Sequence, residues 1–111
     1  MRITEWLKIL SAENGSDLFL SVGAPPCAKF QGQLKPIASD ILQPGEIKQI
    51  AYEIMDPTQR ATFEQELEMN LAISISGYGR FRINIFLQRN EVGIVARNIV
   101  AEIPRWQDLR L

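Results

Sequence analysis

Residues 79–99 read GRFRINIFLQRNEVGIVARNI, and apolar and polar residues alternate in this stretch as they do in paired β-strands. It holds four arginines and no lysine. One face of its first strand is expected to be apolar and carries Phe81, Ile83, Ile85 and Leu87. The opposite face is expected to be polar and carries Arg80, Arg82, Asn84 and Gln88. The stretch therefore predicts a sheet with one face of guanidiniums, which suit carboxylates and phosphates.

Outside this strand, the rest of the chain divides into further strands and three helices. The other strands are expected at 16–22, 27–31, 33–37, 69–76 and 92–99. Gly32 is expected to turn a short hairpin, and the last three strands are expected to form a meander. Helical spacing of apolar residues appears at 4–13 and again in two segments between residues 44 and 67. Strands on both sides of helices predict an α+β domain whose antiparallel sheet has helices on one face.

Local signals mark the ends of the first two helices. Thr4 is expected to cap the first helix, and Asn14-Gly15 is expected to end it in a left-handed conformation. Pro44 is expected to open the second helix. The buried stripe of that second helix is expected to consist of Ile47, Ile50, Ala51 and Ile54.

The third helix has the strongest start signal in the chain. Asp56 is expected to cap it, Pro57 to take its first position and Gln59 to complete a capping box. Phe63 and Leu67 are expected to supply its buried contacts.

Composition limits the classes of function. The chain has 111 residues, of which 46% are hydrophobic, and this suits a single domain with an ordinary core. The formal net charge of −1 argues against general nucleic-acid binding, although residues 77–99 sum to +3. The single cysteine, Cys27, allows no intrachain disulfide, and a structural thiol is favoured over a reactive one. No signal-peptide core or membrane span appears, so a soluble, cytoplasmic protein is expected.

Catalytic and metal sites are hard to build from these residues. The chain has no histidine, which removes the commonest general base and metal ligand. The GxxxxGK[ST] phosphate loop is absent, and Gly77-x-Gly79 is interpreted as a turn. Glu64, Glu66 and Glu68 are interpreted as a solvated face. We therefore expect no catalytic residue, no metal site and no resident cofactor in this chain.

The arginine face leaves two interpretations open. A row of cations on an exposed sheet often serves solubility or pairs with acids on neighbouring strands. A phosphate- or carboxylate-binding role is the alternative, and the absence of lysine favours it. Phe86 is the large apolar residue on that side, where it either stacks on a guanidinium or a partner or twists toward the helices. Gly93, on the next strand, is expected to mark a bulge or a close contact.

An ordered set of short motifs resembles the N-terminal domain of the PilT/PilU ATPases, which retract type IV pili. The set comprises Ser16-Asp17-Leu18, Gly23, Pro25-Pro26, Gly32, Met55-Asp56, Gln59-Arg60, Gly79-Arg80-Phe81-Arg82-Ile83-Asn84, Gln88-Arg89, Gly93 and Arg97 to Ile99. The resemblance runs from Ile3 to Leu111. Phe19, Lys29 and residues 88–90 are nearer the PilU branch.

The resemblance implies a PAS-like fold over residues 1–100 and, over 101–111, the start of a linker to a RecA-like ATPase domain that this chain lacks. It implies a homo-hexamer in which this domain packs against the ATPase domain of a neighbouring subunit. Arg80, Arg82 and Arg97 match the family's arginines that reach bound nucleotide. The resemblance further implies ATP and Mg²⁺ in the longer parent protein and a cytoplasmic location at the inner-membrane pilus machinery.

Two other functions remain as alternatives. A stand-alone PAS-like domain that senses a small ligand would need an enclosed pocket between sheet and helices. Single-stranded nucleic-acid binding would use the arginines and Phe86, although few aromatic residues accompany them there.

Overall fold

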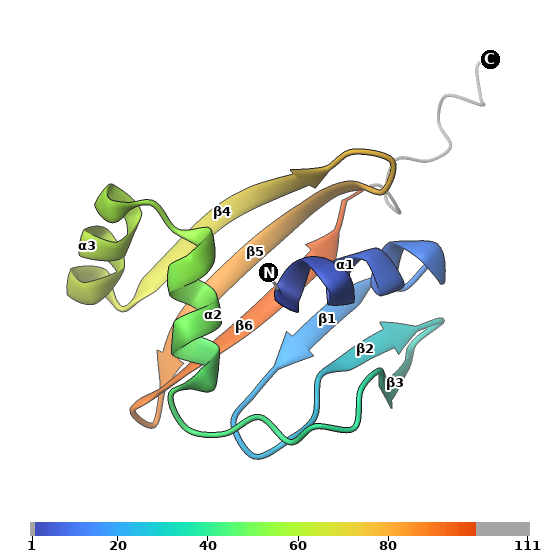
Figure 1. The fold of residues 1–111 in the computed structure, drawn as a ribbon, viewed down its shortest axis with the longest axis horizontal. Coiled ribbons are helices and arrows are strands. Elements are labelled where there is room, and N and C mark those ends of the chain that lie inside the picture. Colours follow the sequence, from blue (N-terminus) through green and yellow to red (C-terminus); the bar gives the residue numbers. More distant parts are fainter. Residues whose placement is uncertain (1, 100–111) are drawn as a thin grey trace.

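The computed structural model describes residues 2–99, which form three helices and six strands (Figure 1). The expected start of a linker, at 101–111, lies outside the described residues. In chain order the elements are α1 (Arg2–Ala12), β1 (Asp17–Leu20), β2 (Cys27–Phe30), β3 (Gln33–Pro36), α2 (Glu46–Ile54), α3 (Pro57–Glu66), β4 (Glu68–Ile75), β5 (Gly79–Gln88) and β6 (Glu91–Asn98).

All six strands belong to one antiparallel sheet with the order β3-β2-β1-β6-β5-β4. Each half of the chain contributes a meander of three strands, and the two halves join where β1 pairs with β6. Asp17 lies opposite Arg97 at this junction, and Leu20 lies opposite Ile94. The predicted α+β class with an antiparallel sheet is confirmed.

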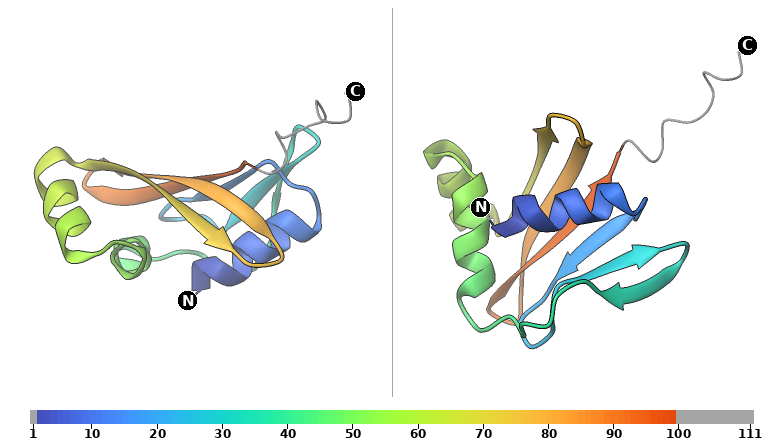
Figure 2. Two further views of the ribbon diagram at one scale, coloured as in Figure 1. Left: turned by 90° about the horizontal axis from the view of Figure 1, so that it is seen from above. Right: turned by 45° about the vertical axis from the view of Figure 1, so that its right-hand side comes forward.

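The helices cover one face of the sheet and leave the other uncovered. Figure 2 shows α1 and α2 on the same side of the sheet, with α3 beside α2 at one end. The apolar side chains between the two layers form one core. Its largest fully buried members are Phe81, Ile3, Leu7, Leu10, Leu18, Leu20, Leu42, Ile47, Ile83, Ile85 and Ile94. Alternation along β5 therefore turns Phe81, Ile83 and Ile85 toward the helices and the arginines away from them.

The start of α3 confirms the predicted capping box. The Gln59 backbone N–H donates to Asp56 Oδ1 at 2.7 Å, and the Asp56 backbone N–H donates to Gln59 Oε1 at 3.0 Å. Pro57 takes the first turn, where its missing N–H leaves no unpaired donor. Asn14 confirms the left-handed end of α1, with φ 58°.

Several local predictions were wrong. α1 begins at Arg2, so Thr4 lies inside the helix and does not cap it. α2 begins at Glu46 after Gly45, which takes the N-cap position, so Pro44 precedes the helix. Leu67 is 48% exposed, because it ends α3 in a left-handed conformation that turns it away from the core.

Leu87 lies on the predicted face of β5, although 37% of its surface is exposed. It keeps the alternation of β5, but it lies at the end of the strand beyond the buried Ile85. Within residues 2–99, no helix is long and apolar enough to cross a membrane.

Candidate functional site

Two neighbouring strands bring the three predicted arginines together on the uncovered face of the sheet. Arg82 on β5 lies directly opposite Arg97 on β6. Arg80 lies two residues from Arg82 on the same face and opposite Ser74 of β4. All three residues are exposed. Residues directly opposite in an antiparallel pair have Cβ atoms about 4.5–5.5 Å apart, so Arg82 and Arg97 are immediate neighbours.

Arg97 is held on its other side by Asp17 of β1. Arg97 Nε donates to Asp17 Oδ1 at 3.3 Å, and the two side chains form an ion pair. The Ser16 hydroxyl donates to Asp17 Oδ2 at 2.9 Å. The Asp17 side chain is only 12% exposed, whereas that of Arg97 is 56% exposed. The nearly buried Asp17 carboxylate thus holds the Nε end of the Arg97 guanidinium, while much of the Arg97 side chain is exposed to solvent.

A row of charges crosses the uncovered face as successive cross-strand partners. Lys29 of β2 lies opposite Asp17, Asp17 opposite Arg97, and Arg97 opposite Arg82. The row contains three cations and one carboxylate. This part of the face therefore carries excess positive charge, although the chain as a whole has a net charge of −1.

A shallow hollow of about 170 Å³ opens between the arginines. Its lining residues are Asp17, Asn70, Arg82, Asn84, Val95 and Arg97. At its edge, Asn84 Nδ2 donates to Asn70 Oδ1 at 2.9 Å and to Glu68 Oε2 at 3.2 Å. Guanidinium and amide N–H groups around one hollow can receive the oxygens of a small anion.

Phe86 lies on the same face of β5 as Arg80 and Arg82. It lies directly opposite Gly93, and a Cβ added at Gly93 would lie 2.6 Å from Phe86 Cε1. The predicted close contact at Gly93 is confirmed, because the ring covers the glycine. Phe86 therefore stays on the arginine side and does not twist toward the helices, contrary to one of the two interpretations.

The remaining arginine of the stretch does not join this face. Arg89 lies in the turn between β5 and β6 with φ 54°, followed by Asn90 with φ 67°. This pair of left-handed residues closes a tight hairpin whose twist matches that of the strands. Arg89 thus offers a matched control for the arginines on the sheet.

Other residues considered from the sequence have structural contacts. Cys27 is half-buried, and its Sγ donates to the Pro25 carbonyl oxygen at 3.3 Å. Glu64 accepts a hydrogen bond from the Tyr52 hydroxyl at 2.6 Å, and this contact raises the pKa of Tyr52. Within residues 2–99, no group of three or more His, Cys, Asp or Glu side chains is placed to hold a metal ion.

The Glu46 carboxylate of α2 also contacts α1, at a place outside the candidate site. Glu46 accepts hydrogen bonds from the Gln43 backbone N–H at 2.7 Å and from Arg2 Nη1 at 2.5 Å. The Gln43 hydrogen bond, followed by the Arg2 contact, lowers the pKa of Glu46 below its ordinary value. This pair stabilises the fold and has no part in the candidate site.

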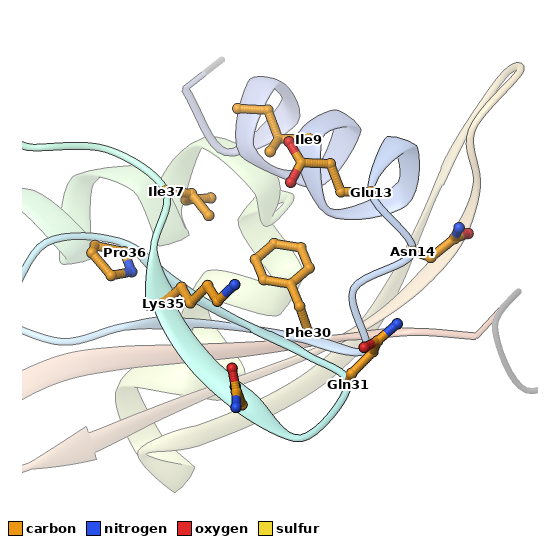
Figure 3. Close-up of a pocket in the computed structure, with 9 residues that line it drawn as sticks. Ile9, Glu13, Asn14, Phe30, Gln31, Lys35, Pro36 and Ile37 are labelled. Atoms are coloured by element: carbon orange, nitrogen blue, oxygen red, sulfur yellow. The ribbon is translucent and has the colours of Figure 1, made fainter.

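A second hollow, of about 550 Å³, opens between α1 and the β2–β3 hairpin (Figure 3). Phe30 forms its floor between Ile9 and Ile37, and Glu13 and Lys35 lie at its rim. The hollow is open to solvent. It thus differs from the enclosed pocket between sheet and helices that the ligand-sensing alternative requires.

Asp17 and Asn70 line the hollow without having been predicted as site residues, although Asp17 belongs to the Ser16-Asp17-Leu18 motif. Arg97, the ion-pair partner of Asp17, is 80 positions away in the sequence. The spacing of residues within one strand therefore could not predict this ion pair, because it depends on the pairing of β1 with β6.

Comparison with known proteins shows clear similarity to two pilus ATPases, although no protein-family model matches the chain. All 111 residues align with the type IV pilus ATPase PilU of Pseudomonas aeruginosa strain PAO1, at 38% identity over 29% of that protein. The type IV pilus retraction ATPase PilT of the same strain is 34% identical over 109 residues, which is 98% of this chain and 32% of that protein. The chain thus spans about a third of the length of these relatives.

Solved structures show the same fold. The pilus retraction motor PilT with bound ADP matches with a TM-score of 0.77 and 32% identity, over 95% of this chain and 32% of that one. The ATPase DotB of Legionella pneumophila matches with a TM-score of 0.66 and 20% identity, over 87% of this chain and 27% of that one. The second match supports the fold alone.

Proposed function

Because the chain belongs to the PilT/PilU family of ATPases, whose N-terminal domain it matches in sequence and fold, we propose that it regulates a pilus-retraction ATPase. In this role it packs against the RecA-like ATPase domain of a neighbouring subunit in a homo-hexamer. It supplies Arg80, Arg82 and Arg97 to the nucleotide bound there. The identity of 38% to PilU against 34% to PilT favours the PilU branch.

The observation that carries this proposal is the grouping of three exposed arginines on the sheet face that the helices leave uncovered. Guanidiniums present several N–H donors in a rigid fork, and their charge stabilises the phosphoryl oxygens of a nucleotide. A covered sheet face would have no room for another domain. The uncovered face lets a second domain bring phosphate to the arginines.

The proposal also assigns different roles to the two domains of the parent protein. About two thirds of PilU and PilT lie outside the matched part, and we assign the ATPase domain to that portion. ATP and Mg²⁺ bind in that domain; Mg²⁺ in particular is placed there, because a face of guanidiniums repels a divalent cation. The domain described here then performs no catalysis alone. The assembled ATPase works in the cytoplasm, at the inner-membrane pilus machinery.

Single substitutions in the full-length ATPase test the proposal. Arg80→Ala, Arg82→Ala and Arg97→Ala should each be compared with wild type for steady-state ATP turnover. Loss of one preorganised donor to a developing anion costs about 10²–10³ in kcat, so at least one variant should show a fall of that order. Arg89→Ala, which removes the same charge in the β5–β6 turn, is the matched control and should retain wild-type turnover. Unchanged turnover in all three sheet variants would reject the proposal.

A further inference from the structure

Asp17 is the one carboxylate in the row of charges that crosses the uncovered face. Its two cross-strand neighbours are Lys29 and Arg97, and Arg82 lies beyond Arg97. Two guanidiniums directly opposite each other repel, and like-charge pairs of this kind destabilise a sheet. Arg82 and Arg97 therefore repel each other, and the negative charge of Asp17 on the other side of Arg97 reduces the cost of this repulsion.

The position of Asp17 is determined more rigidly than that of Arg97. The Asp17 side chain is 12% exposed and accepts hydrogen bonds from both the Ser16 hydroxyl and Arg97 Nε. A carboxylate so nearly buried is stable only when it is paired and hydrogen-bonded, which restricts its rotamer. The Arg97 side chain is 56% exposed, and a long side chain with that exposure has many rotamers unless a fixed group selects one.

The contact through Nε determines the direction in which Arg97 is drawn. Asp17 is on β1 and Arg82 is on β5, so the two lie on opposite sides of Arg97. A hydrogen bond from Nε to Asp17 pulls the base of the guanidinium toward β1 and away from Arg82. The same four residues, Asp17, Arg82, Asn84 and Arg97, line the hollow of about 170 Å³ on this face.

We infer that Asp17 is a positioning residue, which holds Arg97 apart from Arg82 so that both guanidiniums can contact one phosphate group. This inference rests on the proposed function, because it assigns a geometric role within the same arginine site. Asp17 does not touch the phosphate, and it acts only through Arg97. Ser16 supports it by holding the second carboxylate oxygen.

Charge alone predicts the opposite effect of removing Asp17. An anion near the arginines is repelled by the carboxylate, so neutralising Asp17 should strengthen anion binding if only long-range charge mattered. Positioning predicts that Asp17→Asn weakens the action of Arg97, because a neutral acceptor forms a much weaker hydrogen bond to a guanidinium. The sign of the change therefore separates the two accounts.

The test is a double-mutant cycle in the full-length ATPase. Values of kcat and KM for ATP are measured for wild type, Asp17→Asn, Arg97→Ala and the double variant. Asp17→Asn should lower kcat about tenfold, with a smaller change in KM. The same substitution should have no further effect in the Arg97→Ala background. Glu66→Gln is the matched control and should leave kcat unchanged, since it removes one negative charge from an exposed position at the end of α3.

Several results would overturn the inference. If Arg97→Ala lowers kcat and Asp17→Asn does not, Asp17 has no positioning role while the proposed function stands. Additive effects of the two substitutions would also overturn it, because Asp17 would then act independently of Arg97. Unchanged kcat in the Arg80, Arg82 and Arg97 alanine variants would instead refute the proposed function itself, and the inference with it.

A spectroscopic measurement tests the hydrogen bond from Arg97 Nε to Asp17 even if Asp17→Asn fails to fold. In the 111-residue chain, the ¹⁵N–¹H resonance of Arg97 Nε should exchange with solvent at least several-fold more slowly than that of Arg82. Ser16→Ala, which leaves the charge of Asp17 in place, should reduce this difference. Equal exchange rates for Arg82 and Arg97 in the wild-type chain would overturn the inference.

Discussion

Replacing Gly93 with alanine tests whether close contact with Phe86 is the reason for a glycine in the middle of β6. The backbone of Gly93 lies outside the left-handed region, so alanine meets no conformational barrier there. A glycine inside a strand costs about 0.5–1 kcal/mol relative to alanine, so the substitution alone would stabilise the sheet. The ring of Phe86 opposes this gain, since it occupies the place of the new methyl group.

The magnitude follows from the distances. The added Cβ lies 2.6 Å from Phe86 Cε1 and 2.8 Å from Cζ, about 0.8 and 0.6 Å short of the 3.4 Å at which ordinary contact begins. Moving a ring to relieve such overpacking costs about 1–3 kcal/mol. The balance is a net loss of about 1 kcal/mol, or about 4 °C in Tm for a domain of this size. With Phe86→Ala in place, Gly93→Ala should instead raise stability by about 0.5 kcal/mol.

Urea unfolding followed by far-UV circular dichroism measures all four members of this cycle. Gly15→Ala provides a comparison, because its Cβ would lie 2.6 Å from Leu10 Cδ1, a fully buried atom that cannot swing into solvent. That substitution should cost more than Gly93→Ala. The reasoning fails if Gly93→Ala has the same effect with and without Phe86, since the ring would then not be the obstacle.

Two further predictions concern the helix side of the domain. Phe63→Ala should lower the free energy of unfolding, measured with urea, by about 3–5 kcal/mol, because Phe63 is only 3% exposed. Leu67→Ala should cost less than about 1 kcal/mol, because Leu67 is 48% exposed, and equal losses would contradict this difference in burial. The lowered pKa of Glu46 means that its ionised form stabilises the fold above its ordinary value of 4.5, and that this stabilisation is lost as the pH falls through the folded-state pKa. Glu46→Gln should therefore flatten the decline of Tm below about pH 4.5, and parallel Tm curves for variant and wild type would exclude this contribution.

Local chemistry explains which elements were predictable. The start of α3 depends on two hydrogen bonds between residues three positions apart, so the capping box is visible in the sequence and appears in the structure. The turn at Gly32 and the alternation in β5 are also short-range properties. The prediction for Thr4 failed at the N-terminal end of α1, which begins two residues earlier at Arg2, where the guanidinium pairs with Glu46 of α2.

The candidate site shows the same division. Alternation in one strand was enough to place Arg80 and Arg82 on a common face. Arg97 joins them only because β6 pairs with β5 in a register that sets Arg97 opposite Arg82. Asp17 joins through β1, which pairs with β6 across 80 positions of sequence. Long-range strand register is decided by the packing of the whole core and cannot be inferred from spacing within one segment.

By itself, the sequence determined the α+β class, the strand and helix types and the polarity of each sheet face, because these depend on side-chain period and on hydrogen bonds between near neighbours. Only the tertiary structure decided that β1 pairs with β6 to join the two meanders, that Asp17 holds Arg97, and that Leu67 and Leu87 are exposed. Those features arise where distant segments meet, and their energies depend on the burial and register that the folded chain imposes.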